Sequence, residues 1–423
     1  MVNILNNKLF KNIALMCSAT VAAQLINVIV QPILTRIVPA ETLGIFTFLV
    51  SLANILIPIA SLKLDLLITS EVDDNRAQYI TDVCIVVTVI LSLLSLFVIG
   101  AGFWMGVHVL CQYGWIVFTV PVMILTNGLR FLFISYNNRY RQYKIIGFIG
   151  ILREVVRGVI QIFSGVLSLG VLGQVAGYAL APVSGIKTQT KEYIQKYKKR
   201  PSLNFRTFKE ILVKEKKQIL YLVPAQFLNS FSSSLVVLFI SMLYATDQLG
   251  YYSAGVRLLE VPMIFITANV SKVFYRQISE DVNLHNKVLI KFLKISICLF
   301  CISAFIFSVL YFIAPSFSRF VFGRGYEVAG EYIKCLCLMY SLRMVATSFS
   351  GLFTIFGKQQ IELILNALLI VAASVSYLLC KYMSLPITTF AWLISISYSM
   401  MYVLLWLGYF RLIKSYDVKL KRK

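Results

Sequence analysis

Residues 24–68 read QLINVIVQPILTRIVPAETLGIFTFLVSLANILIPIASLKLDLLI, and this stretch sets the pattern for the whole chain. It predicts two apolar helices joined by a turn between Pro39 and Gly44, since proline and glycine stop and restart helices. At about 100° per residue, each helix carries one narrow polar stripe on otherwise apolar faces. The stripes consist of Thr20, Gln24, Asn27, Gln31 and Thr35, and of Gly44, Thr47, Ser51, Asn54, Pro58, Ser61 and Asp65. We expect both stripes to face a protein interior and not lipid.

The composition extends this interpretation to the whole chain. Its 423 residues are 59% hydrophobic and 14% charged, whereas soluble domains are roughly 25% charged. Apolar windows of about 20 residues, the length that spans hydrocarbon, recur about twelve times. They lie at 12–34, 44–66, 80–103, 114–136, 145–168, 171–187, 219–243, 251–271, 289–313, 328–355, 361–380 and 385–410. We therefore expect an all-α polytopic membrane protein of about twelve transmembrane helices, whose first span is retained because no signal cleavage site is apparent.

The basic residues predict how the chain is oriented. Of the 40 Lys and Arg residues, 29 lie on the side of the two termini or at its edge, four on the opposite side and seven inside spans. Both termini are therefore expected to be cytoplasmic, because cytoplasmic connections are enriched in Lys and Arg. Eleven of the 29 fall in the connection 187–217. We interpret them as anchors near anionic headgroups and not as a nucleic-acid-binding arm.

This basic connection divides the predicted spans six and six. The expected organisation is an amino-terminal half at 1–190, a cytoplasmic linker at 191–217 and a carboxyl-terminal half with a short basic tail at 218–423. The second half echoes the first, since Gln226-x-x-Asn229 matches Gln24-x-x-Asn27. Two halves of six spans run in the same sense, so the chain is expected to form a parallel repeat around a central cavity.

Charged side chains inside the predicted spans indicate a binding site, because a charge at the bilayer centre costs about 2.5–3.5 kcal/mol even on the mildest scales. Arg153 and Arg157 share one face of the fifth span, with Glu154 at its margin. The candidate ligands of an anionic substrate are Arg130, Arg153, Arg157, Arg257, Arg343, Gln24 and Asn27. The candidate coupling or ion-pair acids are Glu154, Glu260 and Asp65. The alternative is that each arginine pairs with a neighbouring acid or extends to an interface.

No pattern in the sequence predicts a metal, a cofactor or a catalytic residue. Cys298 and Cys301 have a C-x-x-C spacing, but no histidine or second cysteine pair accompanies them within their span. The two histidines, His108 and His285, fall on opposite sides of the membrane by the predicted topology. The run from Gly351 to Lys358 ends in Gly-Lys but has neither the spacing nor the Ser or Thr of a nucleotide-binding P-loop.

Several short motifs resemble those of a known family. The first half carries Pro32-Ile33-Leu34-Thr35-Arg36, Gly44-Ile45-Phe46 and Ser61-Leu62-Lys63-Leu64-Asp65, and the second carries Leu249-Gly250-Tyr251-Tyr252-Ser253 and Phe356-Gly357-Lys358-Gln359. These resemble bacterial O-antigen and capsule repeat-unit flippases of the multidrug/oligosaccharidyl-lipid/polysaccharide exporter superfamily, which typically have Arg-Tyr-Glu where this chain has Lys63-Leu64-Asp65.

The resemblance implies a function. The chain would move an undecaprenyl-pyrophosphate-linked oligosaccharide across the bacterial cytoplasmic membrane by alternating access, beside a polysaccharide polymerase and a chain-length regulator. Acids in the cavity would couple the cycle to an ion gradient.

Two other functions remain open from the residues. A cation-coupled small-molecule exporter of the same superfamily would be expected to have an acid-dominated cavity, whereas the spans of this chain hold an excess of arginine. A membrane-embedded polysaccharide polymerase would need a sizeable outer loop, and the longest outer connection here, residues 314–328, is short.

The predicted topology can be tested with reporter fusions. Fusions within the 187–217 connection and after Lys423 should be active only with a cytoplasmic reporter, since both lie on the basic side. A fusion near residue 320 serves as the control and should be active only with a periplasmic reporter. Periplasmic activity after Lys423 would contradict the orientation and the even number of spans.

Overall fold

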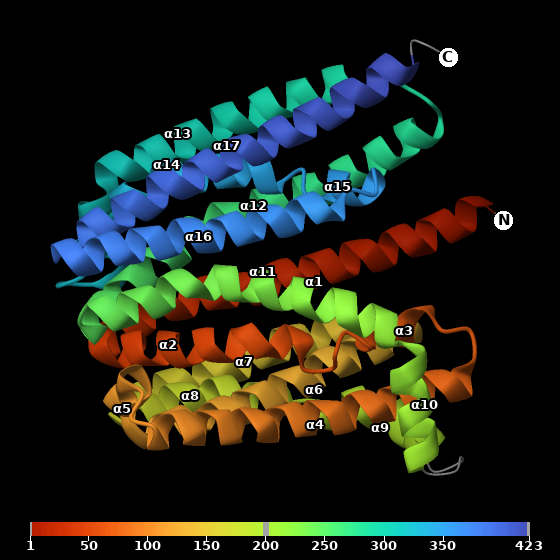
Figure 1. Ribbon diagram of the computed structural model, residues 1–423, viewed down its shortest axis with the longest axis horizontal. Coiled ribbons are helices and arrows are strands. Elements are labelled where there is room, and N and C mark those ends of the chain that lie inside the picture. The colour runs from red at the N-terminus through yellow and green to blue at the C-terminus, as the bar shows by residue number, and fades with distance from the viewer. Residues whose placement is uncertain (1, 198–202, 421–423) are drawn as a thin grey trace. The chain divides into compact units, whose positions relative to one another are not determined.

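The computed structural model describes residues 2–197 and 203–420, and the side chains of these residues except 2–17, 268, 272, 283 and 359. The described residues form helices and the connections between them (Figure 1). The α-helices are α1 Val2–Ile37, α2 Ala40–Leu56, α3 Asp65–Ser70, α4 Asp74–Trp104, α5 His108–Tyr113, α6 Val120–Arg139, α7 Tyr143–Val166, α8 Gly170–Leu180, α9 Ile186–Tyr197, α10 Phe205–Lys214, α11 Lys216–Leu243, α12 Thr246–Asn283, α13 Leu289–Phe322, α14 Glu327–Thr347, α15 Gly351–Ile355, α16 Gln359–Met383 and α17 Ile387–Leu420. Short 3-10 helices are η1 Ile57–Ile59, η2 Gly114–Thr119 and η3 Ala181–Val183.

Every predicted apolar window is helical over most of its length, although some windows are divided between consecutive helices, and this confirms an all-helical polytopic membrane protein. Within the described part of the chain, ten helical segments are long and apolar enough to cross a membrane. The two remaining windows correspond to α7, which carries buried charges, and to α8, which has 11 residues and continues into η3. That α7 and α8 also span the membrane stays a prediction.

The polar stripe of the second window does not continue to Asp65, so that part of the prediction was wrong. The helix α2 ends at Leu56, and η1 contains Pro58, which has no backbone N–H to continue the helix. Leu62 and Lys63 then adopt left-handed conformations, with φ of 52° and 61°, which turn the chain before α3 begins. Asp65 therefore lies at the start of α3 and not at the end of one continuous α2 stripe.

The chain folds into two compact units, residues 1–242 and 243–423. The division lies after α11, whereas the predicted boundary of the two halves lies in the basic connection before it. The compact units are defined by which residues pack together, whereas the predicted halves are defined by the order of spans along the sequence. The division into two six-span halves therefore stays a prediction.

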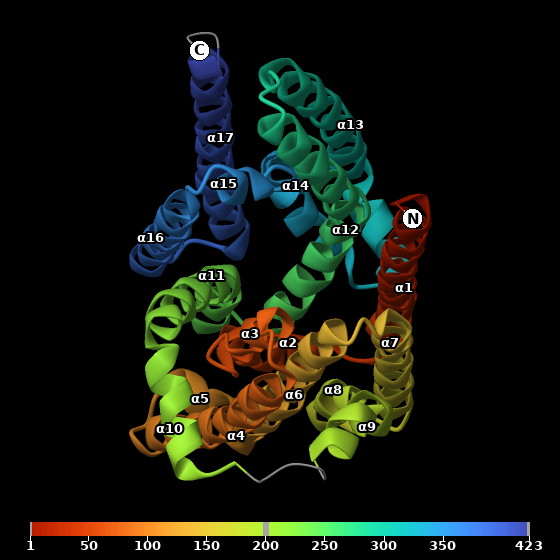
Figure 2. The ribbon, with the colours of Figure 1, turned by 90° about the vertical axis from the view of Figure 1, so that its right-hand side faces the viewer.

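In the first unit, glycines allow α7 to pack closely against two helices (Figure 2). A Cβ on Gly158 of α7 would lie 2.7 Å from Val30 of α1, and one on Gly177 of α8 would lie 2.5 Å from Gln161 of α7. Small residues at helix contacts bring backbones together inside membranes, where no hydrophobic force does so. The charged face of α7 is thereby held against its neighbours.

In the second unit, α14 packs against α12, α13 and α17. Aromatic side chains fill its core, and Phe292, Phe349 and Phe353 are at most 1% exposed. The Asp417 carboxylate at the end of α17 accepts hydrogen bonds of 3.0 Å from two backbone N–H groups at the start of α13. A capping side chain of this kind satisfies donors that a helix start leaves open.

The tightest glycine contact of the second unit gives a stability prediction. A Cβ on Gly330 of α14 would collide with the backbone of Pro315 in α13, which cannot move aside as a flexible side chain would. We expect Gly330→Ala to lower the free energy of unfolding by about 1–3 kcal/mol, measured as the melting temperature of the purified protein. Gly408→Ala in α17 is the matched control, because nothing lies within 4 Å of its Cβ position. Equal melting temperatures for the two variants would contradict the packing described here.

Candidate functional site

Three charged side chains on α7 form a cluster, as their spacing predicts. Glu154 is buried, with 4% of its side chain exposed, and Arg153 and Arg157 are 23% and 17% exposed. Arg153 donates a hydrogen bond to Glu154 Oε1, while Arg157 Nη2 lies 2.5 Å from Glu154 Oε2 as an ion pair without hydrogen-bond geometry. We call these residues the α7 charge cluster. One carboxylate thus serves two guanidiniums, and the cluster keeps one positive charge in excess.

The polar stripe of α1 meets this cluster. Arg157 donates a hydrogen bond to Asn27 Oδ1, across the contact that Gly158 makes possible. Gln24 lies half-buried about one turn earlier on α1. The structure therefore brings Asn27 to the candidate site, as predicted for the interior face of the first window.

Arg130 of α6 adds a third positive charge. Its guanidinium lies over the Phe131 ring, 4.2 Å from the ring centroid, and it is within electrostatic range of all three members of the α7 charge cluster. The buried Nε atom of Arg130 has no hydrogen-bond partner among the described residues. Together, Arg130 and the α7 charge cluster hold three guanidiniums and one carboxylate, a formal excess of two positive charges at this site.

Tyr178 of α8 completes this side of the site, and the sequence analysis missed it. Its hydroxyl donates a 3.2 Å hydrogen bond to Asn54 Oδ1 of α2 and lies in the field of the three arginines. Nothing in the local sequence separates Tyr178 from the other tyrosines of the chain. The packing of α8 against α7, α2 and α6 brings it here.

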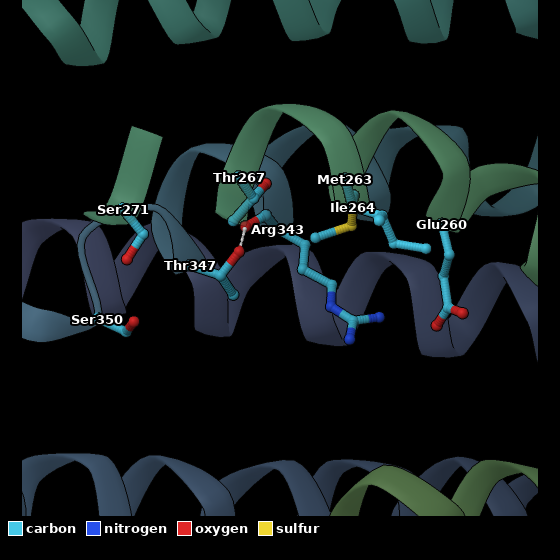
Figure 3. A pocket seen from close by; sticks show the side chains of 8 residues that line it. All are labelled: Glu260, Met263, Ile264, Thr267, Ser271, Arg343, Thr347 and Ser350. Carbon is cyan, nitrogen blue, oxygen red and sulfur yellow. Dashed lines mark hydrogen bonds between the residues drawn. The ribbon is translucent and has the colours of Figure 1, made fainter. Parts of the chain in front are cut away.

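The second unit has a polar cavity of about 360 Å³ (Figure 3). It is lined by Glu260, Met263, Ile264, Thr267 and Ser271 of α12, by Arg343 and Thr347 of α14, and by Ser350. Figure 3 shows the Arg343 guanidinium between the hydroxyls at one end of the cavity and the Glu260 carboxylate at the other. The sequence analysis predicted Arg257 and Arg343 as ligands on two helices of this unit, but it did not predict Thr347 or Ser350. The i,i+4 spacing of Arg343 and Thr347 is the signal that could have found Thr347.

The Arg343 guanidinium lies near an aromatic ring and makes no ion pair within the described part of the chain. Its guanidinium lies 5.3 Å from the centroid of the Tyr340 ring. Thr347 donates a 2.7 Å hydrogen bond to the Arg343 carbonyl, and the buried Thr267 hydroxyl has no partner among the described residues. The cavity thus offers a cation and unused hydroxyl groups to a ligand.

Glu260 lies in the fields of Arg343 and of Arg257, three residues before it on α12. Within the part of the chain that the structure describes, Arg343 forms no ion pair with this carboxylate, although both line the same cavity. Glu154, in contrast, is paired twice, and Asp65 accepts hydrogen bonds of 2.5 Å from Ser61 and 3.3 Å from Ser135. Asp65 is therefore separate from the α7 charge cluster, and Glu260 is the least constrained of the three candidate acids.

Among the described residues, no group of three His, Cys, Asp or Glu side chains is placed to hold a metal ion. The chemistry available in both units is that of guanidiniums, hydroxyls, amides and single carboxylates. Such groups bind and release a ligand through hydrogen bonds and charge.

A family and several solved structures match the chain. The family profile described as "Polysaccharide biosynthesis protein" matches residues 9–280. None of the curated proteins compared with the chain matches it. The lipid II flippase MurJ in an inward closed conformation is 13% identical with a TM-score of 0.76, and the match covers 96% of this chain and 90% of that one.

A multidrug resistance MATE family transporter of the MOP superfamily matches in two conformations. The inward-facing structure is 18% identical with a TM-score of 0.66, covering 93% of this chain and 95% of that one. The outward-facing structure is 16% identical with a TM-score of 0.59, covering 96% and 95%. These matches establish the fold as that of MOP-superfamily transporters.

The α7 charge cluster gives a stability prediction. Replacing both Arg153 and Arg157 by Ala leaves Glu154 buried and unpaired, which should cost about 3–5 kcal/mol and lower the amount of folded protein in the membrane. Adding Glu154→Gln removes the buried charge and should restore that amount. The measurement is membrane abundance and melting temperature of the double and triple variants. If the double variant were as abundant in the membrane as the wild-type protein, a structural role for the ion pairs would be contradicted.

Proposed function

The chain belongs to the polysaccharide biosynthesis protein family, and from this premise we propose that it is a flippase for undecaprenyl-pyrophosphate-linked oligosaccharide repeat units. It would carry them from the cytoplasmic to the outer leaflet of the bacterial cytoplasmic membrane, for O-antigen or capsule assembly. Both termini would be cytoplasmic. A polymerase and a chain-length regulator would act on the delivered units.

The observation that carries this proposal is the excess of guanidinium groups in the first unit. Arg130 and the α7 charge cluster hold three guanidiniums and one carboxylate on helices that are otherwise apolar. Guanidinium binds phosphate through paired, charge-assisted hydrogen bonds. A pyrophosphate brings the negative charge that this part of the protein lacks, while its lipid tail stays in the bilayer.

The cavity of the second unit supports a role in sugar binding. Its hydroxyls on Thr267, Ser271, Thr347 and Ser350 and the guanidinium of Arg343 can exchange hydrogen bonds with a saccharide. Arg257 would add a second cation on the same helix as Glu260. We assign the pyrophosphate to the first unit and the oligosaccharide to the second.

An alternating-access cycle is consistent with the fold, because the MATE family transporter that this chain resembles is found facing inward and facing outward. The driving force would be an ion gradient. Glu260 is the acid we favour for coupling, since Glu154 is paired with two arginines and Asp65 with two serines. Proton or cation binding at Glu260 would change the charge that Arg343 experiences.

A cation-coupled drug exporter is the second candidate, and the fold alone does not separate it from a flippase. Such an exporter binds cationic compounds, for which carboxylates are the expected partners. The surplus of arginine in the first unit opposes this. A polymerase is a third candidate, and the family to which the chain belongs consists of transporters.

Arg130 provides the sharpest test of the function, because it makes no ion pair within the part of the chain that the structure describes. We expect Arg130→Gln to keep normal membrane abundance and to reduce surface polysaccharide at least tenfold in a deletion host, with the lipid-linked unit accumulating on the cytoplasmic leaflet. Arg130→Lys should restore part of the transport, since it keeps the charge without the planar fork. Arg206→Gln on α10, where the arginine is exposed, is the control for lost charge.

Three outcomes would contradict the proposal. Full surface polysaccharide with Arg130→Gln would remove Arg130 from the substrate path. Single repeat units on the surface of the deletion strain, without chains, would favour a polymerase. Transport by the variant lacking Arg153, Arg157 and the Glu154 charge would assign the α7 charge cluster to folding alone.

A further inference from the structure

The first unit also contains a cavity, which does not include any residue of the α7 charge cluster. It has a volume of about 620 Å³ and is formed by α4, α6 and α9. Ile85, Leu129, Phe133 and Ile194 give it an apolar lining, and Lys187 and Lys191 of α9 belong to the same lining. None of these residues takes part in the proposed transport site. We call this cavity the α9 groove.

The α9 groove is preformed, because polar contacts fix α9 on the helices beneath it. The Tyr193 hydroxyl of α9 donates a 2.6 Å hydrogen bond to Asp82 of α4, and its ring lies 5.7 Å from that of Phe133. Asn137 of α6 donates a 3.2 Å hydrogen bond to the Gln189 carbonyl of α9. A ligand would therefore enter a groove whose walls are already in place, which lowers the entropy cost of binding.

The two lysines of the groove are available for an anion. Lys187 and Lys191 are exposed, stand four residues apart on one face of α9, and make no ion pair within the described residues. Lys196 on the same helix differs, because it lies 3.1 Å from Glu192 and 3.6 Å from Asp74. Two unneutralised ammonium groups thus stand beside an apolar surface.

We propose that the α9 groove binds an anionic phospholipid of the cytoplasmic leaflet. An acyl chain would lie on Leu129, Phe133 and Ile194, and the headgroup phosphate would sit between Lys187 and Lys191. A soluble anion would leave the apolar lining unused, and a zwitterionic lipid would leave the lysines without a net negative partner. The predicted topology places α9 at the cytoplasmic surface, where anionic headgroups are abundant. The proposal is independent of the transported substrate.

Lipid retention by the purified full-length protein tests this proposal. Native mass spectrometry would compare phosphatidylglycerol, phosphatidylethanolamine and undecaprenyl phosphate, each alone and in equimolar competition. The wild-type protein should retain phosphatidylglycerol at least tenfold better than phosphatidylethanolamine. Lys187→Gln with Lys191→Gln should weaken phosphatidylglycerol retention about 30-fold, since each lysine at an anionic surface contributes about 1 kcal/mol, whereas Lys187→Arg with Lys191→Arg should keep it.

Two further variants separate the groove from general charge. Lys209→Gln with Lys214→Gln removes the same charge from exposed positions on the neighbouring α10 and should leave the preference unchanged. Ile194→Trp fills the groove with both lysines intact and should weaken phosphatidylglycerol binding. Melting temperatures without lipid would confirm that each variant is folded, and added phosphatidylglycerol should raise the melting temperature of the wild type but not of the Lys187/Lys191 glutamine variant.

Either of two results would overturn the proposal. An unchanged lipid preference in folded Lys187→Gln/Lys191→Gln protein would show that the lysines bind no headgroup. Displacement of phosphatidylglycerol by an equimolar amount of undecaprenyl phosphate would make the groove a site for the polyprenyl carrier instead.

Discussion

The cost of holding charge among apolar helices governs this structure. Glu154 is nearly inaccessible, yet it is retained because two guanidiniums from its own helix surround it. Pairing of this kind requires close neighbours, since a buried ion pair is favourable only when its remaining donors find partners. The glycine contact between α7 and α1 supplies them, because it brings Asn27 within reach of Arg157. Helix packing and electrostatics in the first unit therefore depend on each other.

The two units meet the same constraint by different means. In the first, opposite charges pair directly and α8 packs over them through glycines, which leaves a compact cluster with surplus positive charge. In the second, Arg343 lies near an aromatic ring, and Glu260 lines the same cavity without an ion pair to any described residue. A compact cluster suits a small, densely charged group, and an open cavity with hydroxyls suits a larger polar one. This difference is the physical basis for assigning pyrophosphate and sugar to different units.

Sequence reasoning located the long helices because apolar length and a 3.6-residue period are local properties. It placed Arg153 and Arg157 on one face of a helix, with Glu154 at its margin, for the same reason. The prediction failed where the backbone is not α-helical. The helix α2 ends just before Pro58, and Leu62 and Lys63 turn the chain. Asp65 therefore does not lie on the polar stripe to which the helical period assigned it. Tyr178 and Ser350 were missed because their role arises only from contacts between helices. The α9 groove was missed for a related reason, since its apolar lining comes from three separate helices.

In the proposed function, the guanidinium of Arg130 would link substrate binding to the change of conformation. The buried Nε of Arg130 has no acceptor among the described residues. A bound phosphate would supply negative charge there, so it would stabilise most strongly the conformation in which its oxygens reach all three arginines. A ligand shifts a conformational equilibrium only through such a difference in affinity. A proton at Glu260 would act in a comparable way. It would remove a negative charge from the second unit and would favour the conformation in which the neutral carboxyl group is more stable. In the proposed function, the surplus positive charge of the first unit would bind the substrate and Glu260 of the second unit would bind the coupling ion, so that each could bias the cycle separately.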